Sequence, residues 1–161
     1  MSEEALYRPA SDFLCIVING EVPLAGGEFA EQNLARLIEY TSDEDDSNRD
    51  WATLLLAQLE LDRADVVEAL LRIADDKNQF VRGEAILGLA NLGHQDAFTL
   101  VHRELENEFV QLQVFEAAKI LADSRLLEHL KWYQDATDEP AVDDAARAAL
   151  KACQKRGSKE I

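Results

Sequence analysis

A pattern of Ala and Leu residues recurs along this chain at intervals of about thirty positions. Each time, a stretch rich in Asp and Asn leads into a helix with Ala and Leu at fixed places, and a second amphipathic helix follows. The clearest copy spans residues 75–90, and its counterparts begin at Trp51, Glu116 and Val142. One hairpin cannot cover its own apolar stripe, so the repeats are predicted to stack in series. We therefore expect an all-α fold.

The net charge of −16 is the compositional feature that most restricts the partners of this chain. It argues against binding to nucleic acid, whose phosphates attract Lys and Arg, and equally against anionic membrane surfaces. It favours a basic protein as partner, since opposite charges speed encounter. The alternative is that the acidity only keeps the protein in solution. The seven Gly and three Pro among 161 residues favour helices over a loop-rich β fold.

The two cysteines, Cys15 and Cys153, lie near opposite ends of the chain. An elongated stack would hold them apart, and reduced thiols are typical of a cytoplasmic protein. The first residues lack the positive charge that begins a signal peptide. The apolar run from Phe13 to Ile18 is far too short to span a bilayer. We therefore predict a cytoplasmic location.

The repeats divide the chain into three parts. Residues 1–41 are interpreted as an N-terminal capping segment with a first helix, 42–156 as the repeats and 157–161 as a tail. The repeats comprise about three hairpins and a terminal helix that begins near Pro140, where a missing N–H is tolerated. The helices of the hairpins are predicted at 49–59 with 65–74, 81–92 with 96–106, and 111–122 with 125–134.

Some local details allow more than one interpretation. Residues 12–18 are predicted to form a helix that ends at Asn19-Gly20, because Pro23 weakens the second strand of the alternative, a hairpin around the same Asn-Gly pair. Ser47 or Asn48 is the predicted cap of the helix at 49–59, and Ser124 that of the helix at 125–134.

The run from Asp76 to Leu89 resembles a HEAT repeat, in the short bacterial form that is also found in phycobilin lyases. Val81-Arg82 matches the Val-Arg pair of that pattern, and Arg49 is its equivalent in the preceding repeat. The third repeat has no basic residue there, and the last has Asp143. The resemblance covers roughly residues 42–155. It implies a HEAT/armadillo-like right-handed superhelix of stacked antiparallel helical hairpins, and it carries little information about chemistry.

The sequence shows no set of residues that indicates catalysis, a cofactor or a metal. A Gly-rich phosphate loop and a Gly-x-Ser-x-Gly motif are both missing. The stretch His102–Glu106 contains no second histidine, so it is not a zinc motif, and His102 is expected to pack half-buried where the preceding repeat has Leu71. The loop at 41–50 alternates acidic residues as a calcium loop does, but Asn48 and Leu54 stand where Gly and Glu are needed. We predict no enzymatic activity, no cofactor and no metal.

Alignment of the hairpins predicts where a protein partner would bind. The resemblance implies that the second helix of each hairpin lines the concave face. Alignment of these helices places Glu68 and Glu128 in one row, and the other candidates in a second row. Trp132 is interpreted either as an interface residue, since Trp and Arg are enriched in hot spots, or as a cap on the core. The candidate partner-binding residues are Glu39, Glu68, Arg72, Arg103, Glu128 and Trp132.

These observations favour a non-enzymatic protein–protein interaction module with a concave, acidic surface. Its sharper form is an inhibitor or immunity protein for a basic toxin or nuclease. The alternatives are an accessory scaffold or assembly factor, a lyase-like protein that binds a small ligand, and a protein that associates with itself.

Overall fold

The structure, a computed structural model, describes residues 7–133 and 138–157, which form only helices, turns and loops. The predicted all-α fold is therefore confirmed. The helices, in chain order, are α1 (Asp12–Ile18), α2 (Glu28–Tyr40), α3 (Asp46–Gln58), α4 (Ala64–Ile73), α5 (Gln79–Asn91), α6 (Ala97–Glu104), α7 (Leu112–Leu121), η1 (Ser124–Leu126), α8 (Leu127–Leu130), η2 (Lys131–Tyr133) and α9 (Pro140–Gly157).

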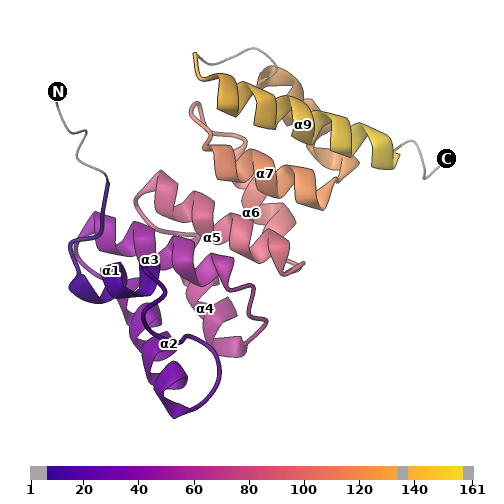
Figure 1. Cartoon of the computed structure of the whole chain (residues 1–161). Helices are drawn as coiled ribbons and strands as arrows, with labels where there is room; N and C mark the ends of the chain where they lie inside the picture. Colours follow the sequence, from indigo (N-terminus) through magenta and orange to yellow (C-terminus); the bar gives the residue numbers. More distant parts are fainter. Residues whose placement is uncertain (1–6, 134–137, 158–161) are drawn as a thin grey trace.

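The helices form two layers. Helices α3, α5, α7 and α9 pack side by side in one row, each in direct contact with the next (Figure 1). Helices α2, α4, α6 and α8 form the second layer, in which neighbours barely touch one another. We call the closely packed row from α3 to α9 the inner layer. The inner layer thus consists of the first helix of each hairpin and the terminal helix.

The segment before the repeats is helical, as predicted. Helix α1 ends at Asn19, and Gly20 follows with a positive φ of 71°, a conformation that suits glycine. The alternative hairpin is wrong, since the described residues contain no strand. Phe13, Leu14 and Val17 of α1 are buried and join the common core. This segment therefore covers the N-terminal end of the apolar core.

Two of the predicted helix caps are wrong. Asp45, rather than Ser47 or Asn48, caps α3 by accepting from the backbone N–H groups of both of those residues. Asp123, rather than Ser124, caps the next segment by accepting from the N–H of Arg125. An ionised carboxylate is the stronger acceptor at a helix N-terminus, where it also meets the positive end of the dipole.

The second helix of the third hairpin, predicted at 125–134, is broken into η1, α8 and η2. Gln134 lies outside the described residues, as do tail residues 158–161. The break brings Tyr133 over the loop before α7, where its hydroxyl lies 2.7 Å from the carbonyl oxygen of Asn107 and 3.0 Å from that of Leu105. In the preceding repeats an arginine holds the corresponding loop carbonyls. Tyr133 therefore replaces the arginine that the third repeat lacks.

Gly88 marks the closest approach of two inner helices. A Cβ atom at Gly88 would lie 2.8 Å from the Cβ and 3.2 Å from the Cα of Ala57 on α3, whereas at Gly83 the nearest atom would be 3.4 Å away. Gly83→Ala should stabilise the protein by about 0.5–1 kcal/mol through helix propensity. Gly88→Ala should instead destabilise it by about 1–2 kcal/mol, because overpacking outweighs that gain.

Urea denaturation of the two alanine variants measures both effects on one helix. Equal stabilisation by both substitutions would contradict the close packing of α3 on α5.

Within the described ranges, no helix is both long and apolar enough to cross a bilayer.

Candidate functional site

The six predicted partner-binding residues all lie on the second layer. Helix α2 carries Glu39, α4 carries Glu68 and Arg72, α6 carries Arg103, and the segment α8–η2 carries Glu128 and Trp132. The backbones of these helices approach one another less closely than those of the other layer do. That they line a concave face stays a prediction.

Three of these six side chains are engaged within the protein. Arg72 donates to the hydroxyl of Thr41 over 2.8 Å. Arg103 forms an ion pair with Asp75 over 2.7 Å, and Glu128 forms one with Lys131. Glu39 and Glu68 are exposed and form no ion pair among the described residues. Arg72 and Arg103 therefore connect neighbouring repeats, whereas the contact of Glu128 is local to its own segment.

Trp132 is 83% exposed, which rules out the interpretation that it caps the core. The neighbouring Tyr133 takes that place, with its ring centroid 5.2 Å from that of the buried Phe115. Whether Trp132 contacts a partner stays a prediction. An exposed indole of this size is compatible with that role.

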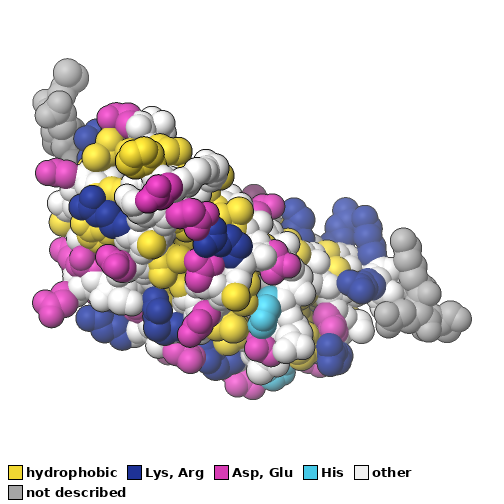
Figure 2. All heavy atoms as spheres, turned by 90° about the horizontal axis from the view of Figure 1, so that it is seen from below, with side chains coloured by type: hydrophobic (Ala, Val, Ile, Leu, Met, Phe, Trp, Pro, Cys, Tyr) yellow, Lys and Arg dark blue, Asp and Glu magenta, His cyan; other side chains and the backbone are white. Residues whose placement is uncertain are grey.

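Charges of both signs cover the face shown in Figure 2. Asp and Glu side chains alternate with Lys and Arg side chains there, and basic side chains gather towards the C-terminal end. A charged partner of either sign would meet repulsion as well as attraction on such a face.

Three carboxylates lie next to one another across the inner layer, one on each of three successive helices. They are Asp50 on α3, Glu84 on α5 and Glu116 on α7, which we call the acidic row. Gln113 of α7 donates to Glu84 over 2.6 Å and fixes this carboxylate between the two helices. Among the described residues, none of the three carboxylates lies in an ion pair.

The pKa values show that the acidic row is electrostatically unfavourable. Burial raises the pKa of Glu84, and the negative charges of Asp50 and Glu116 raise it further, although the hydrogen bond from Gln113 lowers it. Burial also raises the pKa of Asp50, while a hydrogen bond from Tyr7 opposes the shift. The row therefore holds like charges together, and no cation of residues 7–133 or 138–157 forms an ion pair with them.

An aromatic pair closes the N-terminal end of the acidic row. The rings of Tyr7 and Trp51 stack with centroids 6.0 Å apart. Burial, followed by the hydrogen bond to Asp50, raises the pKa of Tyr7 to about 12. The indole N–H of Trp51 is buried and has no hydrogen-bond partner among the described residues. This pair places apolar surface directly beside the first carboxylate.

Exposed apolar side chains also flank the other two carboxylates. Phe80 lies one helical turn before Glu84 and is 51% exposed, and Ile120 lies one turn after Glu116 and is 45% exposed. Residues four apart share one face of a helix. Carboxylates beside exposed apolar groups are typical of a surface that binds protein, where apolar contacts supply affinity and charges supply specificity.

Sequence reasoning missed the acidic row, although one signal for it was present. Trp51, Glu84 and Glu116 are equivalent in the repeat alignment. Equivalence in the alignment does not by itself mark a binding surface, and the resemblance to HEAT repeats implies one on the second helices instead.

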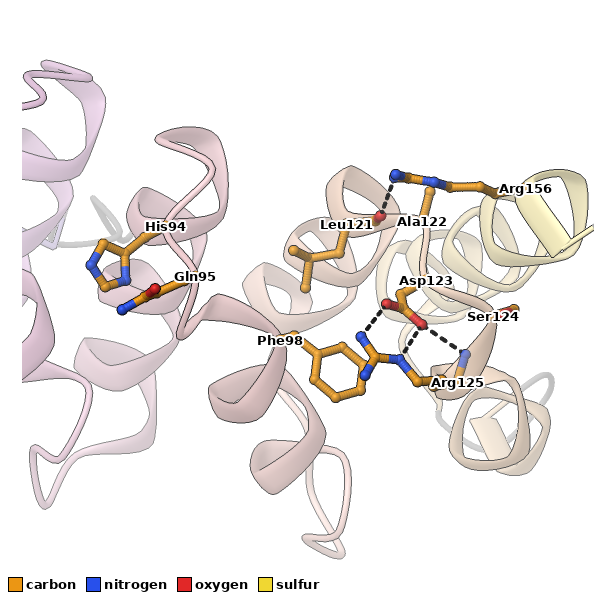
Figure 3. Close-up of a pocket in the computed structure, with 9 residues that line it drawn as sticks. All are labelled: His94, Gln95, Phe98, Leu121, Ala122, Asp123, Ser124, Arg125 and Arg156. Carbon is orange, nitrogen blue, oxygen red and sulfur yellow. Dashed lines mark hydrogen bonds and ion pairs between the residues drawn. The ribbon is translucent and has the colours of Figure 1, made fainter. Parts of the chain in front are cut away.

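A cavity of about 550 Å³ opens on one edge of the stack, between the loop after α5 and the end of α7 (Figure 3). Its two arginines are already engaged. Arg125 pairs with Asp123 and stacks 3.9 Å from the centroid of the Phe98 ring, and Arg156 donates to the carbonyl of Leu121. Arg125 lowers the pKa of Asp123 through this hydrogen bond. Both arginines that line the cavity therefore already have partners within the protein.

The raised pKa of Glu84 makes stability depend on pH. Because the folded state binds this proton more tightly than the unfolded chain, the ionised carboxylate costs stability near neutral pH, and the cost disappears as pH falls through the folded pKa. Glu84→Gln keeps the acceptor for Gln113. It should raise the free energy of unfolding at pH 7 by less than about 1 kcal/mol, and this gain should vanish near about pH 4.

Urea denaturation at the two pH values measures this difference against the parent protein. The same substitution at the exposed Glu116 is the control, and its effect should be smaller. A gain at Glu84 that is equal at both pH values would contradict an electrostatic origin.

Comparison with known proteins defines the class of this chain. The family model of HEAT repeats matches residues 34–103, which contain most of α2 and the hairpins α3/α4 and α5/α6. Together with the stacked hairpins this confirms the predicted resemblance, and residues 34–103 are HEAT-like repeats.

Particular relatives are similar to it over most of its length. Protein YibA of Escherichia coli K12 and that of Escherichia coli O157:H7 are each 31% identical over 122 residues, which cover 74% of this chain and 39% of YibA. The X-ray structure of the Escherichia coli YibA superposes with a TM-score of 0.58 at 24% identity, and the match covers 85% of this chain and 54% of that one. This last likeness shows a shared fold. The chain spans only part of the length of these relatives.

Proposed function

We propose that this protein acts by binding another protein rather than by catalysis, and that the inner layer contacts a basic segment of that partner. HEAT repeats typically mediate protein binding, and extended stacks of this kind offer long concave surfaces for it. The observation that carries the proposal is the acidic row, in which Asp50 and Glu116 lie close enough to Glu84 to raise its pKa, and none of the three forms an ion pair among the described residues.

A Lys or Arg of a partner would offset the repulsion between the carboxylates of this row. It would lower the raised pKa of Glu84 and form charge-assisted hydrogen bonds, which are stronger than neutral ones. The net charge of −16 would steer a basic partner towards the protein from a distance. Phe80 and Ile120 would then supply apolar contact on either side. Within this class, an inhibitor or immunity protein for a basic toxin or nuclease fits best, because an acidic surface can occupy a basic cleft.

A scaffold or assembly factor is the second candidate, and the exposed Trp132 favours it. An 83% exposed indole on the second layer offers an anchor that is independent of charge. A scaffold that used this anchor would bind a larger partner that is not especially basic.

Affinity capture of the tagged protein from its native cells, at low and high salt, tests the proposal. We expect one stoichiometric basic protein that is lost at high salt, because exposed charge pairs are screened by salt. A large assembly that resists salt would favour the scaffold instead. A small ligand or a second copy of the chain as the only species bound would overturn the proposal.

A further inference from the structure

Two histidines from different hairpins meet on the second layer. The rings of His102 on α6 and His129 on α8 lie with centroids 4.5 Å apart, at an interplanar angle of 67°. Glu106 follows one turn after His102, and its carboxylate lies 3.8 Å from Nδ1 of that ring. The three side chains each offer one ligand atom, and these atoms all lie within 4.8 Å of one another.

We propose that His102, Glu106 and His129 form a binding site for a divalent transition-metal ion, with zinc as the best fit. Two imidazoles and one carboxylate are a ligand set that suits zinc, and a water molecule can complete the tetrahedron. The site would join hairpin α5/α6 to hairpin α7/α8.

The geometry is close to what the ion requires. Ligand atoms about 2.0–2.2 Å from a tetrahedral zinc ion lie about 3.4 Å from one another. The present separations are larger by at most about 1.4 Å, a gap that small side-chain rotations close. Glu106 can make such a movement, because it lies beyond the end of α6 and its side chain is 59% exposed.

The burial of His129 points to a ligand independently of these distances. Its Nδ1 atom is buried and has no hydrogen-bond partner among the described residues. A buried polar atom that makes no hydrogen bond costs free energy, so a native structure seldom leaves one without a partner. A metal ion bound by Nδ1 of His129, between the two rings, would give this atom the partner that it lacks.

The position of the site gives it a consequence for the fold. Helices α6 and α8 belong to the widely spaced layer and make few direct contacts with each other. An ion held by both would connect them and would stabilise the folded state, since the unfolded chain does not hold the three ligands together. At zinc concentrations about 100-fold above the dissociation constant, the melting temperature should rise by about 5–10 °C.

Titration of the metal-stripped full chain with zinc chloride in a calorimeter tests the site directly. We expect one zinc ion per chain with low-micromolar affinity or better. His102→Ala and His129→Ala should each weaken binding by more than about 100-fold, because even the loss of a partner outside the ligand shell costs about 10- to 100-fold. Glu106→Gln should weaken it too, and cobalt chloride should give the absorption bands of a four-coordinate ion.

His94→Ala is the matched control, because the structure places this third histidine at the cavity of Figure 3, where it lies apart from the cluster. It should bind zinc as the parent protein does. If His129→Ala fails to fold, His102→Ala and Glu106→Gln alter more exposed side chains and still decide the question. Affinity only in the millimolar range, or an equal loss in His94→Ala, would overturn the proposal.

Discussion

Replacing Arg49 with alanine is expected to lower the free energy of unfolding by about 3–5 kcal/mol, the usual cost of removing one partner from a buried ion pair. The Arg49 side chain is 7% exposed and lies at the start of α3. Its Nε donates to Asp76 over 2.9 Å, and one terminal nitrogen donates to the carbonyls of Asp43 and Glu44 over 3.0 and 3.1 Å. The substitution would leave both carbonyls without this donor, and it would leave the largely buried carboxylate of Asp76 without its buried cation, with the backbone N–H of Asn78 still donating to it.

Arg63→Ala is the control for this experiment. Arg63 also contacts two carboxylates, those of Glu31 and Asp65, but all three side chains are exposed. Because water screens such pairs, the expected loss is at most about 1 kcal/mol. Urea denaturation of both variants, read by circular dichroism, gives the comparison. Similar losses at the two positions would show that burial does not decide the strength of the Arg49 contacts.

Arg49→Lys separates charge from geometry at the same position. Lysine keeps the positive charge and can pair with Asp76, but it lacks the planar fork that reaches the carboxylate and the carbonyls together. We expect a loss between those of the parent and the alanine variant. The arginine of the HEAT pattern, which is Arg49 in this repeat, ties the start of α3 to the loops on either side.

The fold followed from the sequence because it depends on periodicity. The spacing of apolar residues located α3 to α7, the helices of the hairpins up to the broken segment, to within a few residues. The broken segment of the third hairpin was not predictable in this way. Its cause is a contact between Tyr133 and the carbonyls of Leu105 and Asn107, which lie 26–28 positions earlier in the chain.

The candidate sites depend on distances between helices, which periodicity does not contain. The sequence aligned Trp51, Glu84 and Glu116, but only the spacing of the helices shows that they lie on the inner layer. The histidine cluster was missed for a related reason. His102 and Glu106 lack a second histidine nearby in the sequence, and the structure supplies His129 from the next hairpin.

Reversing the charge of two residues in the acidic row should abolish most partner binding. Glu84→Lys combined with Glu116→Lys places positive charge where a basic segment would bind, and like charges across an interface cost several kcal/mol. We therefore expect the affinity for the captured partner to fall by more than about 100-fold. Calorimetric titration measures the change, and circular dichroism verifies that the helices remain.

The control is a second double variant, Glu39→Lys with Glu68→Lys, on the other layer. Each double variant changes the net charge from −16 to −12, since two residues each change by two units. Long-range steering is therefore weakened equally in both, and only the location of the new charges differs. Strong loss in the acidic-row variant alone would place the partner on the inner layer. Strong loss in the control alone would instead place the partner on the second layer, as predicted from the sequence. Equal losses would show that net charge, rather than either surface, controls binding.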